Sequence, residues 1–189
     1  MPATKREQIL ETAERLFYAE GFHATGIDRV TAEAGVVRMT LYNNFASKDE
    51  LIATVLQRRH ARFLAALDAA LAASAPGRGT LALVAAHNAW LAEHGAKGCI
   101  LVKALGEFAA HNPTIAELAL AAKAELRTRL RAALHRDGFA DADLDDLSDR
   151  IFLVLEGSNA AVPVAGVAPV TAQTRAAVAD LLDAAVHPN

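Results

Sequence analysis

The stretch TGIDRVTAEAGVVRMTLYNNFASK, residues 25–48, is the part of the chain that decides the fold. Its first half places apolar side chains at helical spacing after Thr25, a residue type that caps helix N-termini well. Gly35 then offers the positive φ that a tight turn between two steeply crossed helices requires. A second short helix is expected over residues 37–44. The stretch therefore has the pattern of a helix-turn-helix.

The second of these helices is expected to bury one side and to expose the other. Val36, Leu41 and Phe45 are predicted to point inward. The outer surfaces carry small or hydrogen-bonding side chains, which suit the reading of base edges in a DNA major groove better than the packing of a core. The predicted DNA-contacting residues are Arg38, Met39, Thr40, Asn43 and Asn44 on this helix, Tyr42 and Lys48 for phosphates, and Thr25 at the start of the supporting helix.

The region from Arg6 to Leu51 resembles the DNA-binding region of the tetracycline-repressor (TetR) family of bacterial transcription regulators. The resemblance covers about the first third of the chain and rests on Arg6, Gly21, Thr25, Ala34-Gly35-Val36, Thr40-Leu41-Tyr42, Phe45, Ser47-Lys48 and Leu51. Val37 departs from the pattern, because many members carry a polar residue at this position. A valine cannot form the hydrogen bond of such a residue, but its methyl groups can make an apolar contact instead.

Composition favours an all-α protein, and the helical segments expected along the chain number about nine. The chain has 189 residues, of which 53% are hydrophobic and 22% charged, with only 11 Gly and 6 Pro and abundant alanine. The predicted division is a three-helix helix-turn-helix DNA-binding domain over residues 1–46 and a larger helical domain over residues 47–189. The family resemblance implies that the second domain binds a ligand and dimerises.

Capping signals predict where most helices begin and end. Thr4 and Glu7 have the spacing of a capping box, and the helix that they open is expected to stop near Gly21. Ser47 and Glu50 open a long helix that runs to about residue 73. Residues 74–79 form the clearest break. Later helices are expected over residues 80–94, 98–111, 113 to an end at Asp137-Gly138, 144–162 and 171–186.

Charge and hydropathy predict a cytoplasmic protein that does not enter a membrane. The first residues are charged and lack the apolar segment of a signal peptide, and the apolar tract over residues 151–170 is interrupted by Glu156, Asn159 and Pro163. Residues 1–60 hold eight Lys or Arg and eight Asp or Glu, so we expect modest non-specific affinity for DNA and a need for two copies on it.

In the family that the chain resembles, an effector pocket lies among the middle helices and the two C-terminal helices form the dimer interface. The pocket candidates are apolar side chains with one carboxylate: Phe63, Trp90, Cys99, Glu107, Phe108 and Phe152. Each of them alone is more typical of a core, and the pocket is predicted only for the group. The interface candidates are Phe152, Leu155, Gly157, Ser158, Val178, Leu181 and Leu182. A monomer core is the alternative for these helices.

The predicted function is a ligand-responsive, dimeric regulator that binds a palindromic operator in double-stranded DNA and is released from it by an unknown small-molecule effector. The alternative is a helical small-molecule binding protein or enzyme whose N-terminal helices are only structural. The chain has no nucleophile triad and no nucleotide-binding loop signature, so we expect neither enzyme activity nor a cofactor. No metal site is expected either, because His87, His94 and His111 lack a ligand spacing and Cys99 is the only cysteine.

Overall fold

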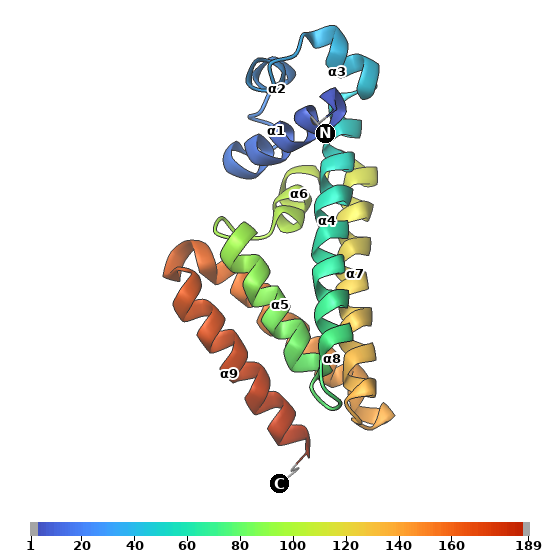
Figure 1. The fold of residues 1–189 in the computed structure, drawn as a ribbon, viewed down its shortest axis with the longest axis vertical. Coiled ribbons are helices and arrows are strands. Elements are labelled where there is room, and N and C mark those ends of the chain that lie inside the picture. Colours follow the sequence, from blue (N-terminus) through green and yellow to red (C-terminus); the bar gives the residue numbers. More distant parts are fainter. Residues whose placement is uncertain (1–3, 187–189) are drawn as a thin grey trace. The chain divides into compact units, whose positions relative to one another are not determined.

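The computed structural model describes residues 4–186, and over these residues the chain forms nine α-helices and no strand (Figure 1). The all-α prediction and the expected number of helices are confirmed for this part of the chain. The helices are α1 (Lys5–Glu20), α2 (Ile27–Glu33), α3 (Arg38–Asn44), α4 (Lys48–Ala73), α5 (Gly79–His94), α6 (Ile100–Phe108), α7 (Pro113–Arg136), α8 (Asp141–Ala165) and α9 (Val167–Val186).

The helices pack as two compact units, and each is described by itself. Unit 1 takes in the chain up to His60 together with Ile100–Ala122, and unit 2 takes in Ala61–Cys99 and the chain from Lys123 onward. Unit 1 therefore holds α1, α2, α3 and α6, unit 2 holds α5, α8 and α9, and α4 and α7 contribute residues to both. The predicted boundary between a DNA-binding domain, residues 1–46, and a ligand-binding domain, residues 47–189, divides the chain by function and not by packing. It stays a prediction.

The three helices of the helix-turn-helix region share a small core; of the residues predicted to point inward, Leu41 and Phe45 are buried and Val36 is half-buried. Phe17 of α1, Val30 of α2 and Leu41 of α3 have no exposed surface, and Ile27 and Phe45 are buried beside them. Figure 1 shows α2 and α3 joined by a short turn. Gly35 in this turn has φ of 62°, the left-handed conformation that glycine adopts without steric cost.

The capping predictions hold at two helix starts and fail at a third. Thr4 and Glu7 form the expected capping box at α1. At α4, the Ser47 hydroxyl accepts from the Glu50 N–H at 3.0 Å, as predicted, while the Glu50 carboxylate accepts from the N–H of Ala46. The prediction for Thr25 is wrong, because α2 begins at Ile27 with Gly26 as its N-cap.

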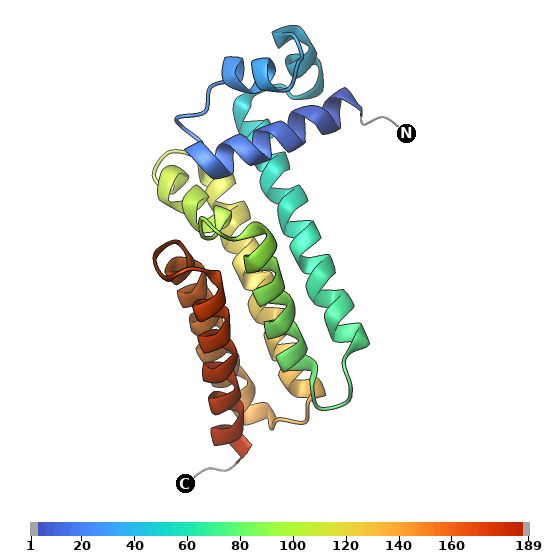
Figure 2. The same ribbon diagram turned by 60° about the vertical axis from the view of Figure 1, so that its left-hand side comes forward.

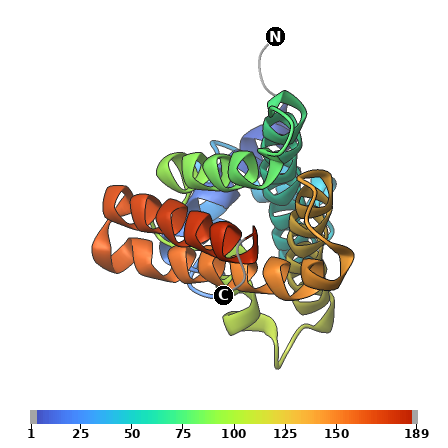
Figure 3. The same cartoon turned by 90° about the horizontal axis from the view of Figure 1, so that it is seen from below.

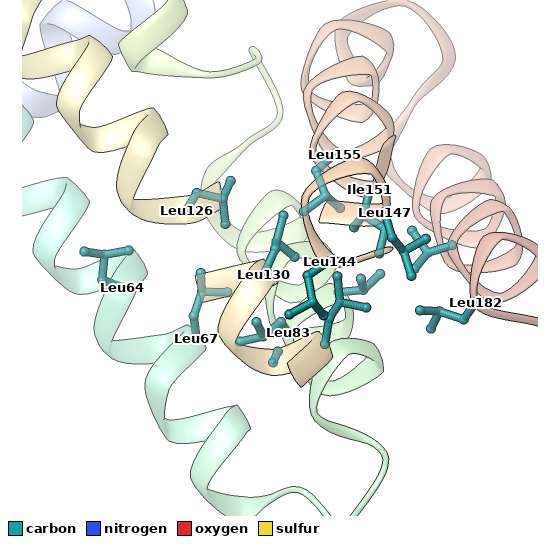
Figure 4. Close-up of a cluster of buried hydrophobic side chains, with 14 residues drawn as sticks. Leu64, Leu67, Leu83, Leu126, Leu130, Leu144, Leu147, Ile151, Leu155 and Leu182 are labelled. Atoms are coloured by element: carbon teal, nitrogen blue, oxygen red, sulfur yellow. The ribbon is translucent and has the colours of Figure 1, made fainter. Parts of the chain in front are cut away.

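Unit 2 is built around a leucine-rich core (Figure 4). α8 and α9 lie side by side, as Figures 2 and 3 both show, and α5 packs against α9. The fully or largely buried side chains of this core are Leu64, Leu67, Leu83, Val84, Leu126, Leu130, Ala133, Leu134, Leu144, Leu147, Ile151, Leu155, Val178 and Leu182. A core of this size gives unit 2 a hydrophobic interior of its own.

Several helix boundaries differ from the prediction. α8 begins at Asp141, because acidic residues in a first turn are favoured by the helix dipole, and it continues past Pro163 to Ala165. α9 begins at Val167, so that Pro169 lies in its first turn, where the missing N–H has no helical partner to lose. α6 is shorter than expected. Within the described residues, no helix has both the length and the apolarity that crossing a bilayer requires.

Candidate nucleic-acid interface

α3 buries one side and exposes the other, in the orientation that the sequence predicts. Leu41 has no exposed surface, whereas Arg38, Met39, Tyr42 and Asn43 are exposed to solvent. This outward orientation is a property of the fold. That these side chains bind DNA stays a prediction.

The other predicted DNA contacts are less accessible. Thr40, Asn44 and Lys48 are half-buried. The side-chain amide of Asn44 donates to the carbonyl of Thr40 at 2.8 Å, so this donor already has a partner within α3.

The structure corrects the prediction for Thr25. This residue is fully buried, and its hydroxyl donates to the carbonyl of Gly21 at 2.7 Å. Its side chain stabilises the loop between α1 and α2 and has no surface for DNA. A threonine that precedes a helix satisfies either a helix N–H or a loop carbonyl, and the sequence alone does not distinguish the two.

Arg38 is the cationic group of the exposed side of α3. Its guanidinium lies 3.5 Å from the carboxylate of Asp28 and 5.9 Å from the centre of the Tyr42 ring. A hydrogen bond with Tyr42 raises the pKa of Arg38 above its ordinary value, and the charge of Asp28 acts in the same direction. Arg38 thus carries a positive charge at every physiological pH.

Four further arginines of unit 1 are paired with carboxylates. The most buried pair joins Arg59 of α4 to Glu14 of α1 at 2.9 Å, with side chains 9% and 11% exposed. The others are more exposed. They are Arg15–Glu33 at 2.7 Å, Arg29–Glu33 at 3.2 Å and Arg58–Glu11 at 3.2 Å. These pairs offset much of the positive charge that would otherwise attract DNA phosphates.

Glu107 and Phe108 of α6 brace the loop between α1 and α2. The two carboxylate oxygens of Glu107 accept from the backbone N–H groups of Phe22, at 3.1 Å, and His23, at 2.8 Å. The ring of Phe108 packs edge-on against that of Phe22, with centroids 5.5 Å apart. Both residues thus make contacts within unit 1, and the prediction that they line an effector pocket stays a prediction.

The remaining pocket candidates belong to unit 2. The rings of Phe63 and Trp90 lie 5.4 Å apart, and Phe152 packs, partly buried, against the same core as Phe63. The thiol sulfur of Cys99 accepts from the ammonium of Lys123 at 3.2 Å. The structure therefore assigns these four residues to one unit, without Glu107 and Phe108.

Sequence reasoning missed the ion pair that lies beside Cys99. Lys123 of α7 donates to both oxygens of Glu156 of α8, at 2.7 and 2.8 Å, and both side chains are largely buried. Burial lowers the pKa of Lys123, but Cys99 and Glu156 together outweigh it, so that the pKa is raised. The signal in the sequence is Glu156, a single acid within an otherwise apolar tract, because a buried carboxylate requires a charged or hydrogen-bonding partner.

The residues predicted for the dimer interface differ in how far they are buried. Leu155, Val178 and Leu182 are part of the core of unit 2, so the prediction that their side chains lie at an interface is corrected. Ser158 is buried as well, and its hydroxyl donates to the carbonyl of Leu155. Gly157 is exposed, and Phe152 and Leu181 are half-buried.

An open apolar groove of about 360 Å³ runs between α8 and α9. Gly157 lies in it, and among the described residues no heavy atom comes within 4 Å of the position that a Cβ would take there, apart from the chain neighbours and nearby backbone of α8 itself. The lining residues are Val154, Gly157, Ser158, Ala161, Ala165, Pro169, Val170, Gln173, Thr174 and Ala177. Only Gly157 and Ser158 of the predicted interface residues are among them.

Residues 9–55 match the family described as bacterial regulatory proteins, tetR family. The HTH-type transcriptional activator FasR of Mycolicibacterium smegmatis is 33% identical over 98 residues, which are 52% of this chain and 45% of that protein. The HTH-type transcriptional repressor KstR2 of the same organism is 32% identical over 56 residues, 30% of this chain and 27% of that protein. The chain thus spans less than half of either curated relative in these matches.

Solved structures match almost the whole chain. The structure of SCO4454, a TetR-family transcriptional regulator from Streptomyces coelicolor, is 29% identical and has a TM-score of 0.89, covering 97% of this chain and 90% of that one. The structure of sav143 from Streptomyces avermitilis is 28% identical and has a TM-score of 0.79, covering 97% and 99%. The matched helix-turn-helix, the curated regulators and this likeness agree, and the chain belongs to the TetR family of bacterial regulatory proteins.

Proposed function

We propose that this chain is a cytoplasmic transcription regulator that binds a palindromic DNA operator as a homodimer and responds to a small-molecule effector. The observation that carries the proposal is the exposed side of α3, where Arg38, Met39, Tyr42 and Asn43 project from a helix anchored by the buried Leu41. A helix presented in this way fits a major groove, where Asn pairs with adenine edges and Arg with guanine edges.

Two copies are needed because a single α3 of seven residues reads only a few base pairs. The apolar groove between α8 and α9 supports a second copy as the partner of unit 2, since a C2 dimer presents the same surface from each subunit. The exposed Gly157 permits close approach of a facing helix. Residues 1–46 would then bind DNA, and residues 47–189 would dimerise and bind the effector.

We place the effector site in unit 2, near Phe63, Trp90 and Cys99. The aromatic rings offer apolar contact, and the Lys123–Glu156 pair offers charged groups of both signs. In unit 1, Glu107 holds the loop that precedes α2, so a change in α6 would reach the helix-turn-helix through this carboxylate. An effector that binds better to the DNA-free conformation would shift the population toward it.

A gel shift with the full-length protein tests the function. The probe is a set of duplexes recovered by the protein from a random-sequence pool, together with DNA from beside its own gene. We expect retarded complexes on palindromic duplexes and none on scrambled ones. Failure to prefer any duplex would refute the proposal.

Substitutions on α3 test the assignment of roles. Asn43→Ala is expected to cost ~1–3 kcal/mol of binding free energy and to relax the choice of base at one position of each half-site. Tyr42→Phe and Lys48→Ala are expected to weaken binding about equally on all sequences. If Asn43→Ala left base preference intact, this residue would not be a reader.

The sense of regulation that we propose is repression relieved by the effector. The two curated relatives described above are an activator and a repressor, so a promoter fusion is the direct measurement. Deleting the gene is expected to raise expression from a promoter that contains the operator. A fall in expression would overturn repression and leave DNA binding intact.

A further inference from the structure

Two large apolar side chains project into solvent at the start of α3. Val37, which directly precedes the helix, and Met39 in its first turn are each 69% exposed. They are more exposed than any other large hydrophobic side chain in the described part of unit 1. We call these two residues the apolar patch.

The fold of unit 1 does not require the apolar patch. The inward side of the same segment is already filled by Leu41 and Phe45, which are 0% and 1% exposed. Side chains of the size of Val37 and Met39 gain free energy when an apolar partner removes them from water. Their exposure therefore indicates a contact surface rather than a packing role.

Polar side chains lie beside the apolar patch, so a partner that fits this surface would offer a small apolar group among polar groups. Arg38 lies between Val37 and Met39 in the sequence, and Asn43 is exposed on the same helix. Such a mixture fits the floor of a DNA major groove, where hydrogen-bonding base edges surround one kind of apolar group, the C5-methyl of thymine.

We propose that Val37 and Met39 read thymine methyl groups in the operator. The inference rests on the proposed function and adds A·T pairs to the bases that Arg38 and Asn43 would recognise. Val37 has no side-chain donor or acceptor, so this position discriminates by methyl contact alone. Burying one methyl group changes a dissociation constant by about fourfold, or by about fifteenfold when both half-sites change together.

Replacing thymine by deoxyuridine tests the inference, because this change removes the methyl group and leaves Watson–Crick pairing intact. The probe is the duplex that the full-length protein prefers in a random-sequence pool, with each thymine replaced in turn. We expect about a fourfold loss of affinity at one or two thymines of each half-site and values within about twofold of the parent elsewhere.

Protein variants connect the effect to the patch. With Val37→Ser or Met39→Ala, the affected thymine and deoxyuridine should bind equally well, because the side chain that senses the methyl group is gone. Both positions are exposed, so neither change removes a buried contact. Val102→Ser on α6, a valine that is 49% exposed, is the matched control and should keep the full penalty for deoxyuridine.

The outcomes separate this inference from the function on which it rests. Equal binding of all deoxyuridine duplexes would overturn methyl reading, while specific binding would still support the regulator. An unchanged deoxyuridine penalty in both patch variants would also overturn it. If the protein preferred no duplex at all, the proposed function itself would fail.

Discussion

Removing the carboxylate of Glu107 should loosen the loop between α1 and α2. In the structure its two oxygens accept from the N–H groups of Phe22 and His23 at 3.1 and 2.8 Å. A hydrogen bond to a charged group contributes ~1.5–3 kcal/mol, and we take the lower end because the His23 bond is exposed to water. Glu107→Ala should therefore lower the free energy of unfolding by about 3 kcal/mol, since it removes both acceptors.

The isosteric variant Glu107→Gln gives an intermediate value. The amide retains one oxygen and turns an N–H₂ group toward the other backbone N–H, so one of the two bonds is lost. We expect a destabilisation of about 1.5 kcal/mol. The order of the two variants tests whether both oxygens contribute.

Urea denaturation measures the destabilisation, and amide hydrogen exchange locates it. Amides that exchange only through global unfolding should exchange faster throughout the chain, and the additional local increase should be at the amides of Phe22 and His23 and their neighbours. Glu117→Ala, at an exposed glutamate of α7, is the matched control and should stay within ~0.5 kcal/mol of the parent. The reasoning is refuted if Glu107→Ala leaves the exchange of both amides unchanged.

Three further predictions follow from burial and charge. Burial lowers the pKa of His87 from 6.5 to about 4. Between pH 6.5 and pH 4 the unfolded state therefore binds more protons than the folded state. The free energy of unfolding should keep its full His87 contribution above pH 6.5 and fall by ~3 kcal/mol as the pH drops to 4. His87→Gln should flatten this part of the profile in urea titrations, and an unchanged slope would contradict the assignment. Glu14→Ala should lower the free energy of unfolding by about 3–5 kcal/mol, because it removes the buried carboxylate that pairs with Arg59. Glu11→Ala, which breaks the more exposed pair with Arg58, should lower it by at most ~1 kcal/mol. Equal losses in the two variants would argue against the buried pair. Gly157→Arg should place a charge in the groove between α8 and α9, at a position where an added Cβ meets no other part of the chain within 4 Å apart from the nearby backbone of α8 itself, and sedimentation should then detect monomers; a dimer of unchanged stability would show that the two copies do not meet at this groove.

Local sequence signals predicted the helix-turn-helix well. Capping residues such as Thr4 and the positive φ of Gly35 act over a few residues, so their effect can be read from the chain alone. The position of the apolar Leu41 among polar neighbours likewise predicted which side of α3 is buried. The residues predicted to contact DNA are therefore exposed or half-buried, with the exception of Thr25.

Contacts between distant parts of the chain were beyond this reasoning. Glu107 lies 85 residues from Phe22, and Lys123 lies 33 residues from Glu156, so no spacing rule connects them. The interface prediction failed at Leu155 and Val178 for a related reason. An apolar side chain signals burial, but only the packing of α8 against its neighbours determines whether the burial is within one chain or between two.

The arginine–carboxylate pairs of unit 1 bear on how such a regulator would be distributed in a cell. A chromosome offers roughly 10⁶ or more non-specific sites, and phosphate attraction sets how long a protein stays on each of them. With Arg15, Arg29, Arg58 and Arg59 paired internally, we expect this attraction to be weak, so fewer molecules would be held on irrelevant DNA. A small number of copies per cell would then suffice to keep an operator occupied.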